Sequence, residues 1–455
     1  MAVSLFLLCL IRSSTYKLVI MKASTALLYE KYLQYPLVVT DTRAVKENSI
    51  FFALKGANFN GNEFAAQALA TGAKYAVVDQ PEVAISEQYL LVDDVLKAMQ
   101  SLANHHRSQL QFPVLGITGS NGKTTSKELI NAVLSKKYQT LATTGNLNNH
   151  IGVPLTLLSI QAHHNFAIIE MGANHQLEIK ELCEIAEPNF GLICNIGKAH
   201  LEGMGGIEGV KKTKKELYDF LEINKGLVFV NADDDVTLNL SSQLENRVFF
   251  GNKENSLVAG EIISLAPFLK VSITFKKNNQ KHELATQLIG DYNLANILAA
   301  AAIGVYFGVS ETEIVAAIAA YTPTNNRSQA MQTANNKLIM DAYNANPSSM
   351  FAAINNFHLL STKNKCLILG DMFELGNESV AEHKAIVKLV SELKFENVIF
   401  IGNDFFGAKE LYKQFHFFKT TANAMDFIQD NKIINHTVLV KGSRGMKLES
   451  LMPLL

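Results

Sequence analysis

The residues best suited to chemistry lie in one glycine-rich run, Gly116-Ile-Thr-Gly-Ser-Asn-Gly-Lys-Thr-Thr125. The run follows an apolar, strand-like stretch (Phe112–Ile117) and precedes a helical pattern (Ser126–Lys136). A glycine turn at the start of a helix presents free N–H groups and the positive end of the helix dipole, and both attract phosphate. Lys123 is predicted to neutralise the β- and γ-phosphates, and the Thr124 hydroxyl to bind Mg²⁺. We therefore predict that this loop binds ATP.

The glycine spacing differs from that of the common phosphate-binding loop. The common motif has four residues between its glycines, whereas two residues separate Gly119 from Gly122, and Ile117 occupies the position of the first glycine. A glycine-rich turn between strand and helix, with no ligand, is the structural alternative. The Gly-Lys-Thr-Thr run at a helix start favours phosphate binding, because the strand–loop–helix context is the one that the motif requires.

Two candidate metal ligands follow the loop along the chain. Glu170 ends an apolar strand, and a carboxylate at that position beside a phosphate loop is a common Mg²⁺ ligand, although a single glutamate there also serves to cap a loop. We interpret Cys194–Glu202 as a strand that brings His200 and Glu202 to the same region of a parallel sheet. His200 is predicted to bind a second divalent ion that bridges a phosphate and an acceptor oxygen, the alternative being a loop histidine without a ligand.

A lysine-rich helix is predicted between Val210 and Leu221. Such a cluster is usually a solvated helix face. One stripe with helical spacing (i, i+4, i+7, i+11) contains Val210, Lys214, Leu217 and Leu221. Lys214 is therefore predicted to be buried, while Lys211, Lys212 and Lys215 point away from the stripe. A lysine directed into a core that also receives Mg²⁺ ligands indicates a functional role.

Composition sets the limits within which these residues act. A chain of 455 residues is long enough for two to four domains. The 41 basic and 42 acidic residues nearly cancel, so the charge does not point to nucleic acid or to an anionic membrane surface. The four cysteines (Cys9, Cys183, Cys194 and Cys366) lack metal-ligand spacing and are typical of buried thiols in a reducing compartment. We expect a cytoplasmic, ATP-dependent enzyme.

Strands and helices alternate in three successive segments that would position these residues. Residues 21–110 are predicted to form a small α/β unit with strands at Ser49–Leu54 and Tyr75–Asp79 and a helix at Glu63–Thr71. In residues 111–321 the strand candidates are Phe112–Ile117, Phe166–Glu170, Phe190–Asn195 and Gly226–Asn231. In residues 322–455 they are Lys337–Asp341, Cys366–Gly370, Asn397–Gly402 and Thr437–Gly442. The alternation predicts parallel sheets covered by helices on both faces, with ligands bound where the strands end.

The N-terminal stretch Val3–Ile11 is apolar but fits no targeting signal well. No basic residue precedes it, no small-x-small cleavage site is clear, and it is too short to span a bilayer. Ordinary helical patterning begins after Met21. We interpret residues 1–20 as disordered or as an over-extended start, and we expect no stable membrane association.

Several of these runs together resemble the Mur ligase family. The runs in the central segment are Thr118–Thr125, Gly145–Pro154, Glu170–Gly172, Ala199–Glu202, Gly290–Ala300 and Asn326–Arg327. Within the family, three further runs and His383 resemble the ligase that adds D-alanyl-D-alanine to a UDP-muramoyl tripeptide: Met340–Pro347, Leu369–Gly376 and Val440–Arg444. The similarity extends from Asp41 to the C-terminus, and the motifs occur in one order.

The resemblance implies an α/β fold of three domains. It implies a UDP-substrate-binding domain at residues 21–110, a central parallel-sheet, P-loop-type ATP-binding domain at 111–321, and a Rossmann-like domain at 322–455. The implied reaction is ATP-dependent: the tripeptide carboxylate forms an acyl phosphate, which the amine of D-alanyl-D-alanine then attacks. The implied cofactors are ATP and two Mg²⁺ ions, and we expect the enzyme to act as a monomer without nucleic acid.

The resemblance also assigns roles to individual positions. The implied catalytic residues are Lys123, Lys214 and His200. The implied ATP contacts are Gly119, Ser120, Asn121, Gly122, Lys123, Thr124, Thr125, Asn293, Asn296, Arg327 and Asp341. The implied metal ligands are Thr124, Glu170, His200 and Lys214, the last carbamylated on its amino group. The implied substrate contacts are Asp41, Thr42, Arg43, Lys55, Gly56, Asn148, Asn149, Tyr343, Asn344, Asn346 and Lys441.

The chain departs from the family pattern at two places in its first segment. A serine is commoner at Thr42, and the family's Asp-Gly-His is here Asn60-Gly-Asn62. Three alternatives to this function remain. A folate- or amino-acid-polymerising ligase would lack the nucleotide-binding segment before the loop, and a degenerate regulatory protein would have lost Lys123, Glu170, His200 or Lys214. A sibling ligase that adds the third amino acid is the nearest alternative, disfavoured by the runs at 341–347 and 370–376.

Overall fold

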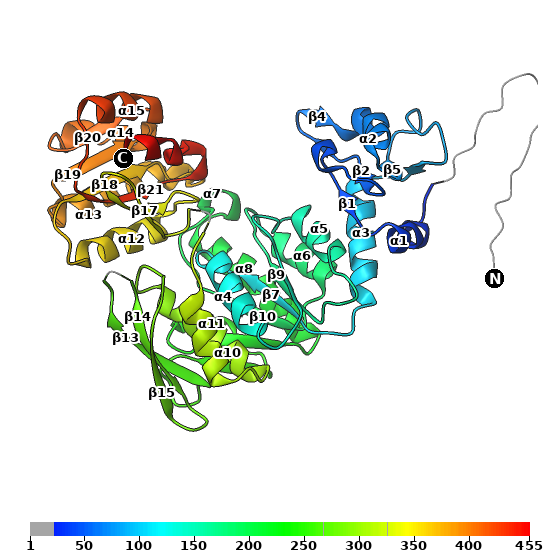
Figure 1. The fold of residues 1–455 in the computed structure, drawn as a ribbon, viewed down its shortest axis with the longest axis horizontal. Helices are drawn as coiled ribbons and strands as arrows, with labels where there is room; N and C mark the ends of the chain where they lie inside the picture. The colour runs from blue at the N-terminus through cyan, green and yellow to red at the C-terminus, as the bar shows by residue number, and fades with distance from the viewer. Residues whose placement is uncertain (1–21, 267, 325) are drawn as a thin grey trace, which may run out of the picture. The chain divides into compact units, whose positions relative to one another are not determined.

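The computed structural model describes residues 22–266, 268–324 and 326–455. The segment interpreted above as an over-extended start, residues 1–20, lies outside the described residues. The chain divides after His106 into two compact units. Figure 1 shows the helices and strands of both units. None of the described helices is long and apolar enough to cross a membrane.

The first unit is built on a four-stranded parallel sheet in the order β1-β2-β5-β6. The strands are β1 (Val38–Val39), β2 (Ile50–Phe52), β5 (Tyr75–Val78) and β6 (Tyr89–Leu91). The helices are α1 (Thr25–Gln34), α2 (Ala65–Thr71) and α3 (Val95–Ser108). Apolar residues of β2 and β5 are fully buried, as expected for a sheet whose faces are covered. The strands predicted at 49–54 and 75–79 are therefore confirmed.

The second unit contains a six-stranded parallel sheet in the order β12-β11-β10-β7-β9-β8. Its strands are β7 (Val114–Thr118), β8 (Thr140–Ala142), β9 (Phe166–Glu170), β10 (Phe190–Ile193), β11 (Leu227–Asn231) and β12 (Arg247–Phe250). Every residue of β7 and β9 is buried, which identifies these as central strands. The predicted parallel alternation is thus confirmed here.

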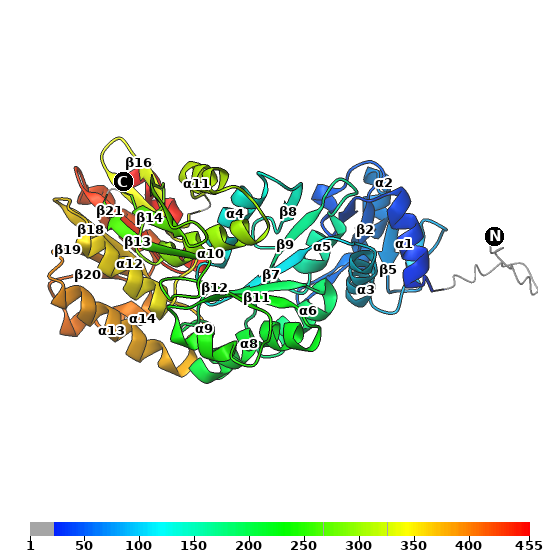
Figure 2. The ribbon, with the colours of Figure 1, turned by 90° about the horizontal axis from the view of Figure 1, so that it is seen from below.

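Helices cover both faces of this sheet (Figure 2). One face carries α4 (Lys123–Leu134), α10 (Asn293–Tyr306) and α11 (Glu311–Ala320), which pack on one another. The other carries α6 (Glu178–Ala186) and α8 (Ile207–Ile223), with α5 (Gly152–Leu158) against α6. Residues 297–303 of α10 are almost entirely buried, and small alanines there allow close approach to α4.

Two features of this region differ from the sequence-based expectation. Residues 258–285 form an antiparallel meander of β13 (Val258–Ser264), β14 (Lys270–Phe275) and β15 (Gln280–Ala285). The predicted strand Cys194–Glu202 is wrong, because β10 ends at Ile193 and α7 (Leu201–Met204) follows a loop. The loop's backbone bonds to the glycine-rich run instead of a neighbouring strand: Ser120 N–H donates to Asn195 O at 3.0 Å, and Gly197 N–H donates to Ser120 Oγ at 2.9 Å.

A second six-stranded sheet, in the order β16-β17-β21-β18-β19-β20, forms the C-terminal part of this unit. Only its edge strand β16 (Gln329–Gln332) is antiparallel, and the others are β17 (Lys337–Asp341), β18 (Lys365–Gly370), β19 (Asn397–Ile401), β20 (His416–Phe418) and β21 (Thr437–Lys441). The helices are α12 (Pro347–Leu359), α13 (Ser379–Glu392), α14 (Asn403–Phe406) and α15 (Thr421–Asp430). Register pairs Asp341 with Lys441 at the carboxyl ends of β17 and β21.

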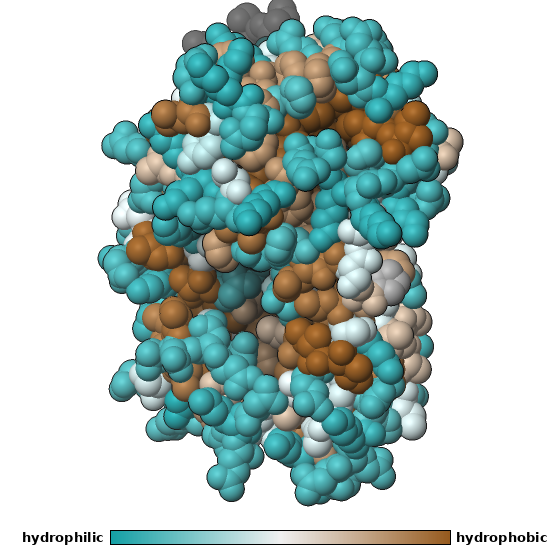
Figure 3. Space-filling view, turned by 90° about the vertical axis from the view of Figure 1, so that its left-hand side faces the viewer, coloured by the Kyte–Doolittle hydropathy of each residue, from teal (hydrophilic) through white to brown (hydrophobic). Residues whose placement is uncertain are grey.

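Figure 3 shows the face of the second unit formed by this C-terminal sheet and the β13–β15 meander. Apolar side chains appear there in several groups, separated by hydrophilic residues. The apolar residues of the sheet strands themselves lie inside, in a core around Ile368, Val440 and Leu448. This face therefore covers a packed core.

Arg107 links the start of the second unit to the end of α6. Its side chain is buried, and its guanidinium donates to Ala186 O (3.0 Å), Glu187 O (2.8 Å), Leu110 O (3.1 Å) and Asn189 Oδ1 (3.3 Å). Two of these acceptors are carbonyls at the C-terminus of a helix, which a cation stabilises. Burial lowers the pKa of Arg107, partly opposed by Glu187.

Arg107→Met is expected to lower the free energy of unfolding by about 2–4 kcal/mol, because several buried carbonyl groups lose their donor. Urea unfolding followed by circular dichroism would measure the change. Arg247→Met is the matched control, since Arg247 is half-buried and contacts the ring of Phe249. Equal, small effects of the two substitutions would contradict the assigned role of Arg107.

Candidate functional site

A cavity of about 580 Å³ lies in the second unit, where strands of both parallel sheets end. Glu170 ends β9, Asn195 follows β10, and Asp341 and Lys441 end β17 and β21. The predicted residues that line it are Ser120, Asn121, Gly122, Lys123, Thr125, Asn148, Asn149, Glu170, His200, Asn293, Asn296, Arg327, Asp341, Tyr343, Asn344, Asn346 and Lys441. Carboxyl ends of parallel strands are the usual ligand-binding edge of such sheets.

The glycine-rich loop turns tightly before α4. Gly119 and Gly122 have φ of 145° and 77°, values that favour glycine. A Cβ at Gly122 would also lie 2.8 Å from Asn296 Oδ1, so a side chain has no room there. Helix α4 begins at Lys123, three residues before the predicted start. The N–H groups of its first turn have no partner within the helix and are available to a ligand in the cavity. These groups fit a phosphate.

Lys123 lies on the wall of the cavity, beside the loop that precedes it. Its ammonium donates to Gly119 O at 2.7 Å and to Ser120 O at 3.3 Å. Burial lowers the pKa of Lys123, an effect that the nearby Glu170 opposes. The side chain is therefore held at the loop, as a phosphate-neutralising lysine requires.

Thr124 and Glu170 meet behind the loop. The Thr124 hydroxyl donates to Glu170 Oε2 at 2.9 Å, and Asn148 Nδ2 donates to Oε1 at 2.9 Å. Glu170 is 1% exposed and Thr124 is 5% exposed. A hydroxyl and a carboxylate at contact distance are oxygen donors of the class that Mg²⁺ prefers, so this pair fits the predicted metal.

Lys127 is a member of this group that the sequence reasoning missed. It is buried, its ammonium donates to Thr143 O at 2.5 Å, and it lies 3.9 Å from Glu170 Oε2. The signal available in the sequence was its position one helical turn after Lys123. Lys127 and the nearby Lys123 both supply positive charge to this buried carboxylate.

His200 reaches the cavity from a loop, with φ of 53°. Its Nδ1 bonds to the carboxylate of Glu374, which the motif comparison left without a role. This hydrogen bond is the main cause that lowers the pKa of Glu374. A carboxylate on Nδ1 fixes the ring and leaves Nε2 to act as a ligand, the usual arrangement of a metal-binding histidine. Glu202, expected nearby, is exposed and lies outside the cavity lining.

Lys214 occupies the buried position predicted from helical spacing. It is 1% exposed on α8, while Lys211 and Lys215 pair with Glu208 and Asp219 at the surface. Burial, reinforced by Lys123, lowers the pKa of Lys214 to about 7. Within the described part of the chain, its amino group has no hydrogen-bond or ion-pair partner. Lys214 does not line the cavity, and nor do Gly119 and Thr124.

Two asparagines at the start of α10 contact the loop side of the cavity. Asn296 Oδ1 accepts from Ser126 Oγ at 2.9 Å, and Asn296 Nδ2 donates to Asn293 Oδ1 at 2.9 Å. Asn293 in turn donates to Ile289 O at 2.8 Å. Both side chains are buried and fixed, as the predicted contacts near an adenine require.

The C-terminal sheet supplies the opposite wall. Lys441 Nζ lies 2.5 Å from Asp341 Oδ2, and Asp341 Oδ1 accepts from Ser328 N–H at 3.0 Å. Asn346 Nδ2 donates to Asn121 Oδ1 at 2.7 Å, which joins this wall to the glycine-rich loop. The structure thus brings together residues more than 200 positions apart in the chain.

The remaining predicted contacts lie in the first unit, which is described separately. Asp41 caps a short 3₁₀ turn (Thr42–Ala44) and pairs with Arg43, whose hydrogen bond lowers the pKa of Asp41. Lys55 precedes Gly56 in β3 (Lys55–Gly56), and its ammonium lies 2.8 Å from Asp79 Oδ1.

The unusual Asn60-Gly-Asn62 run forms a closed network with this aspartate. Asn62 Nδ2 donates to Asp79 Oδ1 at 2.9 Å, and Asp79 N–H donates back to Asn62 Oδ1 at 3.1 Å. Asn60 Oδ1 accepts from Asn62 N–H at 3.1 Å. The two amides therefore satisfy one another and the aspartate without a histidine.

Comparison with known proteins gives matches over most of the chain. Residues 34–107, 117–304 and 326–444 match, in order, the Mur ligase family catalytic domain, the Mur ligase middle domain and the Mur ligase glutamate ligase domain. The chain is 35% identical to the UDP-N-acetylmuramoyl-tripeptide--D-alanyl-D-alanine ligase of Escherichia coli (strain K12), over 90% of this chain and 92% of the relative.

Solved structures show the same similarity. The crystal structure of MurF from Acinetobacter baumannii aligns with a TM-score of 0.82 and 33% identity, over 91% of this chain and 92% of that chain. MurF ligase from Thermotoga maritima in complex with ADP aligns with a TM-score of 0.80, over 93% of this chain and 97% of that chain. At 23% identity, the second comparison supports the fold alone. The three-domain α/β fold expected from the motifs is confirmed, and the protein belongs to the Mur ligase family.

Proposed function

We propose that the protein is an ATP-dependent ligase that joins D-alanyl-D-alanine to UDP-N-acetylmuramoyl-tripeptide in peptidoglycan precursor synthesis. The observation that carries the proposal is the convergence of Lys123, Glu170 and Lys441 on one cavity. The relative from Escherichia coli bears the name of this activity and aligns over 90% of the chain. We assign residues 21–110 to UDP-substrate binding, 111–321 to ATP binding and 322–455 to the C-terminal domain, supported by their separate hydrophobic cores.

The first chemical step transfers phosphate to the tripeptide. A carboxylate oxygen attacks the γ-phosphorus in line, a new O–P bond forms, the bond to the β–γ bridging oxygen breaks, and ADP leaves. Both reactants are anions, so the step requires positive charge at the point of approach. Lys123 and Arg327 supply it, with the N–H groups at the start of α4. Mg²⁺ bound by Thr124, Glu170 and His200 would add to this charge.

The second step forms the amide. The neutral amine of D-alanyl-D-alanine attacks the acyl carbon, and a tetrahedral intermediate expels inorganic phosphate as the nitrogen loses its proton. Tyr343, Asn344 and Asn346 line the C-terminal wall, and we place the dipeptide against them. Lys441, held by Asp341, faces the same space and is suited to stabilise the departing phosphate.

We further propose that Lys214 is carbamylated. An amine with a pKa near 7 is largely uncharged at pH 8, and an uncharged amine attacks CO₂, forming an N–C bond and releasing a proton. The product is a carboxylate-like group that would bind metal, and its burial protects it from water. Within the described residues the amino group forms no hydrogen bond or ion pair, and Glu216 and Glu178 act on it only through their charge, which leaves it available for this reaction.

The UDP moiety of the substrate is assigned to the first unit, at Asp41, Thr42, Arg43, Lys55 and Gly56. The exposed Arg43 and Lys55 supply cationic groups suited to a diphosphate. Three cysteines of the described residues are free and buried, which together with ATP use supports a cytoplasmic location.

The proposed reaction predicts ADP release that depends on both substrates. With ATP and UDP-N-acetylmuramoyl-tripeptide, a coupled assay should show steady turnover after addition of D-alanyl-D-alanine and little before it. Turnover with UDP-N-acetylmuramoyl-dipeptide and a third amino acid, in place of these substrates, would instead support the sibling ligase.

Lys123→Ala should abolish ADP formation and leave the fold intact, because it removes charge at the phosphate site. The assay is ADP release, and circular dichroism tests folding. Lys136→Ala is the matched control, since Lys136 is exposed near the other end of α4. Turnover within about tenfold of the parent enzyme, a barrier change of only ~1.4 kcal/mol, would show that the loop is not the catalytic phosphate site.

Lys214→Ala should reduce activity far more than Lys211→Ala or Lys215→Ala, and a short carboxylic acid in the buffer should restore part of it. Activity of the parent enzyme should also fall as pH drops below about 7, because protonated Lys214 cannot react with CO₂. Carbon-13 NMR after equilibration with labelled bicarbonate should show a carbamate signal that Lys214→Ala lacks. Equal, small effects of the three substitutions would mean that the lysine cluster is only a solvated helix face.

A further inference from the structure

Two arginines share the ring of Tyr343 at the C-terminal wall of the cavity. The guanidinium carbon of Arg327 lies 3.7 Å from the ring centroid, and that of Arg444 lies 5.2 Å from it. Tyr343 and Arg327 line the cavity, whereas Arg444 is exposed and is not part of the lining. Within the described residues, neither guanidinium forms an ion pair with a carboxylate.

Other cations that line the cavity or lie near it already have partners. Lys441 pairs with Asp341, Lys198 pairs with Glu382, and Lys127 lies beside Glu170. Lys123 donates to carbonyls of its own loop. Arg327 is assigned above to the phosphates of ATP. Arg444 is therefore a cation beside the cavity for which the proposed chemistry has given no anion.

The backbone that carries Arg444 is fixed by the neighbouring loop. Ser443 N–H donates to Asp371 O at 3.1 Å, and Phe373 N–H donates to Ser443 Oγ at 2.9 Å. Gly442 packs so closely against Gly370 that a Cβ at 442 would lie 3.0 Å from the Gly370 Cα. Arg444 then begins a 3₁₀ turn (Arg444–Met446). The base of the side chain is thus rigid, while its guanidinium is exposed.

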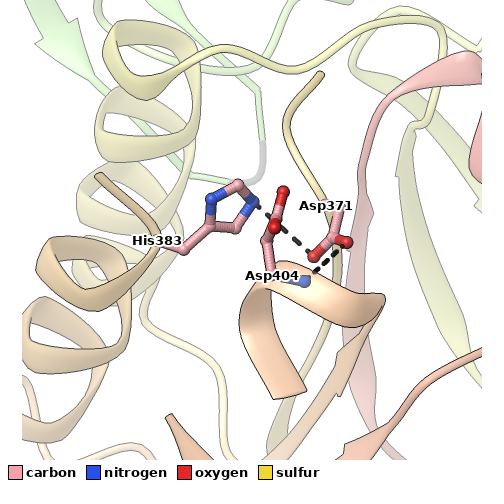
Figure 4. A group of neighbouring side chains, drawn as sticks. All are labelled: Asp371, His383 and Asp404. Atoms are coloured by element: carbon pink, nitrogen blue, oxygen red, sulfur yellow. Dashed lines mark hydrogen bonds and ion pairs between the residues drawn. The ribbon is translucent and has the colours of Figure 1, made fainter. Parts of the chain in front are cut away.

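The loop at Asp371 is itself anchored by the cluster of Asp371, His383 and Asp404 (Figure 4). Asp371 accepts from the N–H groups of Asp404 and Phe405, each at 3.0 Å, at the start of α14. His383 Nε2 accepts from Met372 N–H at 3.0 Å, and Nδ1 bonds Ser379 O at 2.8 Å. Both ring nitrogens of His383 and both carboxylate oxygens of Asp371 form hydrogen bonds, so the cluster fixes the position of the loop.

We infer that Arg444 binds the α-carboxylate of the incoming D-alanyl-D-alanine, an inference that rests on the proposed function. The dipeptide carries its nucleophilic amine at one end and its carboxylate at the other, about 7 Å apart in an extended chain. The amine must reach the acyl phosphate. The carboxylate of the dipeptide then lies about 7 Å further away, on the side of the C-terminal wall where Tyr343 and Arg444 are found. A guanidinium fits a carboxylate with two parallel hydrogen bonds, and the Tyr343 ring orients the guanidinium plane.

This assignment predicts a defect confined to the dipeptide. Arg444→Met should raise the KM for D-alanyl-D-alanine about 10–100-fold and leave the KM values for ATP and the tripeptide substrate within about twofold. Arg444→Lys should raise this KM by an intermediate factor, because lysine keeps the positive charge but cannot form the two parallel hydrogen bonds of a guanidinium. Lys447→Met is the matched control, since Lys447 is an exposed cation three residues further along the same segment.

The decisive comparison uses D-alanyl-D-alanine and its C-terminal amide with each enzyme. The parent enzyme should prefer the acid by at least tenfold in kcat/KM, and Arg444→Met should use acid and amide almost equally. If Arg444→Met folds poorly by thermal melting, Arg444→Gln replaces it in the same comparison. An unchanged preference for the acid in an otherwise active variant would overturn the inference alone. A parent enzyme whose ADP release does not depend on D-alanyl-D-alanine would overturn the proposed function and the inference together.

Discussion

The arrangement of the phosphate side of the cavity depends on the contacts of one buried carboxylate, that of Glu170. An ionised group that is 1% exposed is costly unless neighbours replace the water it has lost. Thr124 and Asn148 donate to it, and Lys127 lies within ion-pair distance. These residues come from α4 and from the loop before α5, so satisfying one carboxylate fixes both elements at the end of β9. The glycine-rich loop is held by hydrogen bonds with the segment after β10, from Ser120 N–H to Asn195 O and from Gly197 N–H to Ser120 Oγ.

The opposite wall depends on a second charge pair, between Lys441 and Asp341. Parallel register places them side by side at the ends of neighbouring strands, where each neutralises the other. The pair keeps a lysine at the cavity without leaving an unbalanced charge inside the protein. Asn346 then bonds Asn121 across the cavity. A single hydrogen bond is weak, so this contact is compatible with walls that separate when substrates enter and products leave.

Local patterns in the sequence predicted the central strands of the sheets, but not the shorter strands at their edges, such as β8, β12 and β20. Strands β9 and β17 match their predicted bounds residue for residue, because continuous apolar runs identify buried parallel strands. The buried position of Lys214 also followed from spacing alone. The strand predicted at Cys194–Glu202 was wrong because the backbone of that segment bonds to Ser120, a contact across more than 70 residues. Lys127, Glu374 and Arg444 were missed for the same reason: each acquires its role from a partner distant in sequence. The meander at 258–285 was not predicted, because β13 and β15 are largely exposed and lack the continuous apolar run of a buried strand.

The site must satisfy two opposite electrostatic demands within a small volume. Phosphate groups require cations, whereas metal ions require anions, and unmodified lysines serve only the first demand. At about 4 Å, an ammonium and a divalent ion repel by about 8 kcal/mol for an effective dielectric constant near 20. The unmodified Lys214 avoids this repulsion only when its amine is uncharged, and burial of the side chain already favours the uncharged state. Carbamylation would go one step further and make it anionic. An uncharged amine on the buried stripe of α8 is compatible with the nearby Lys123. A carbamate there would attract both Lys123 and a metal ion, whereas a permanently charged cation would repel both.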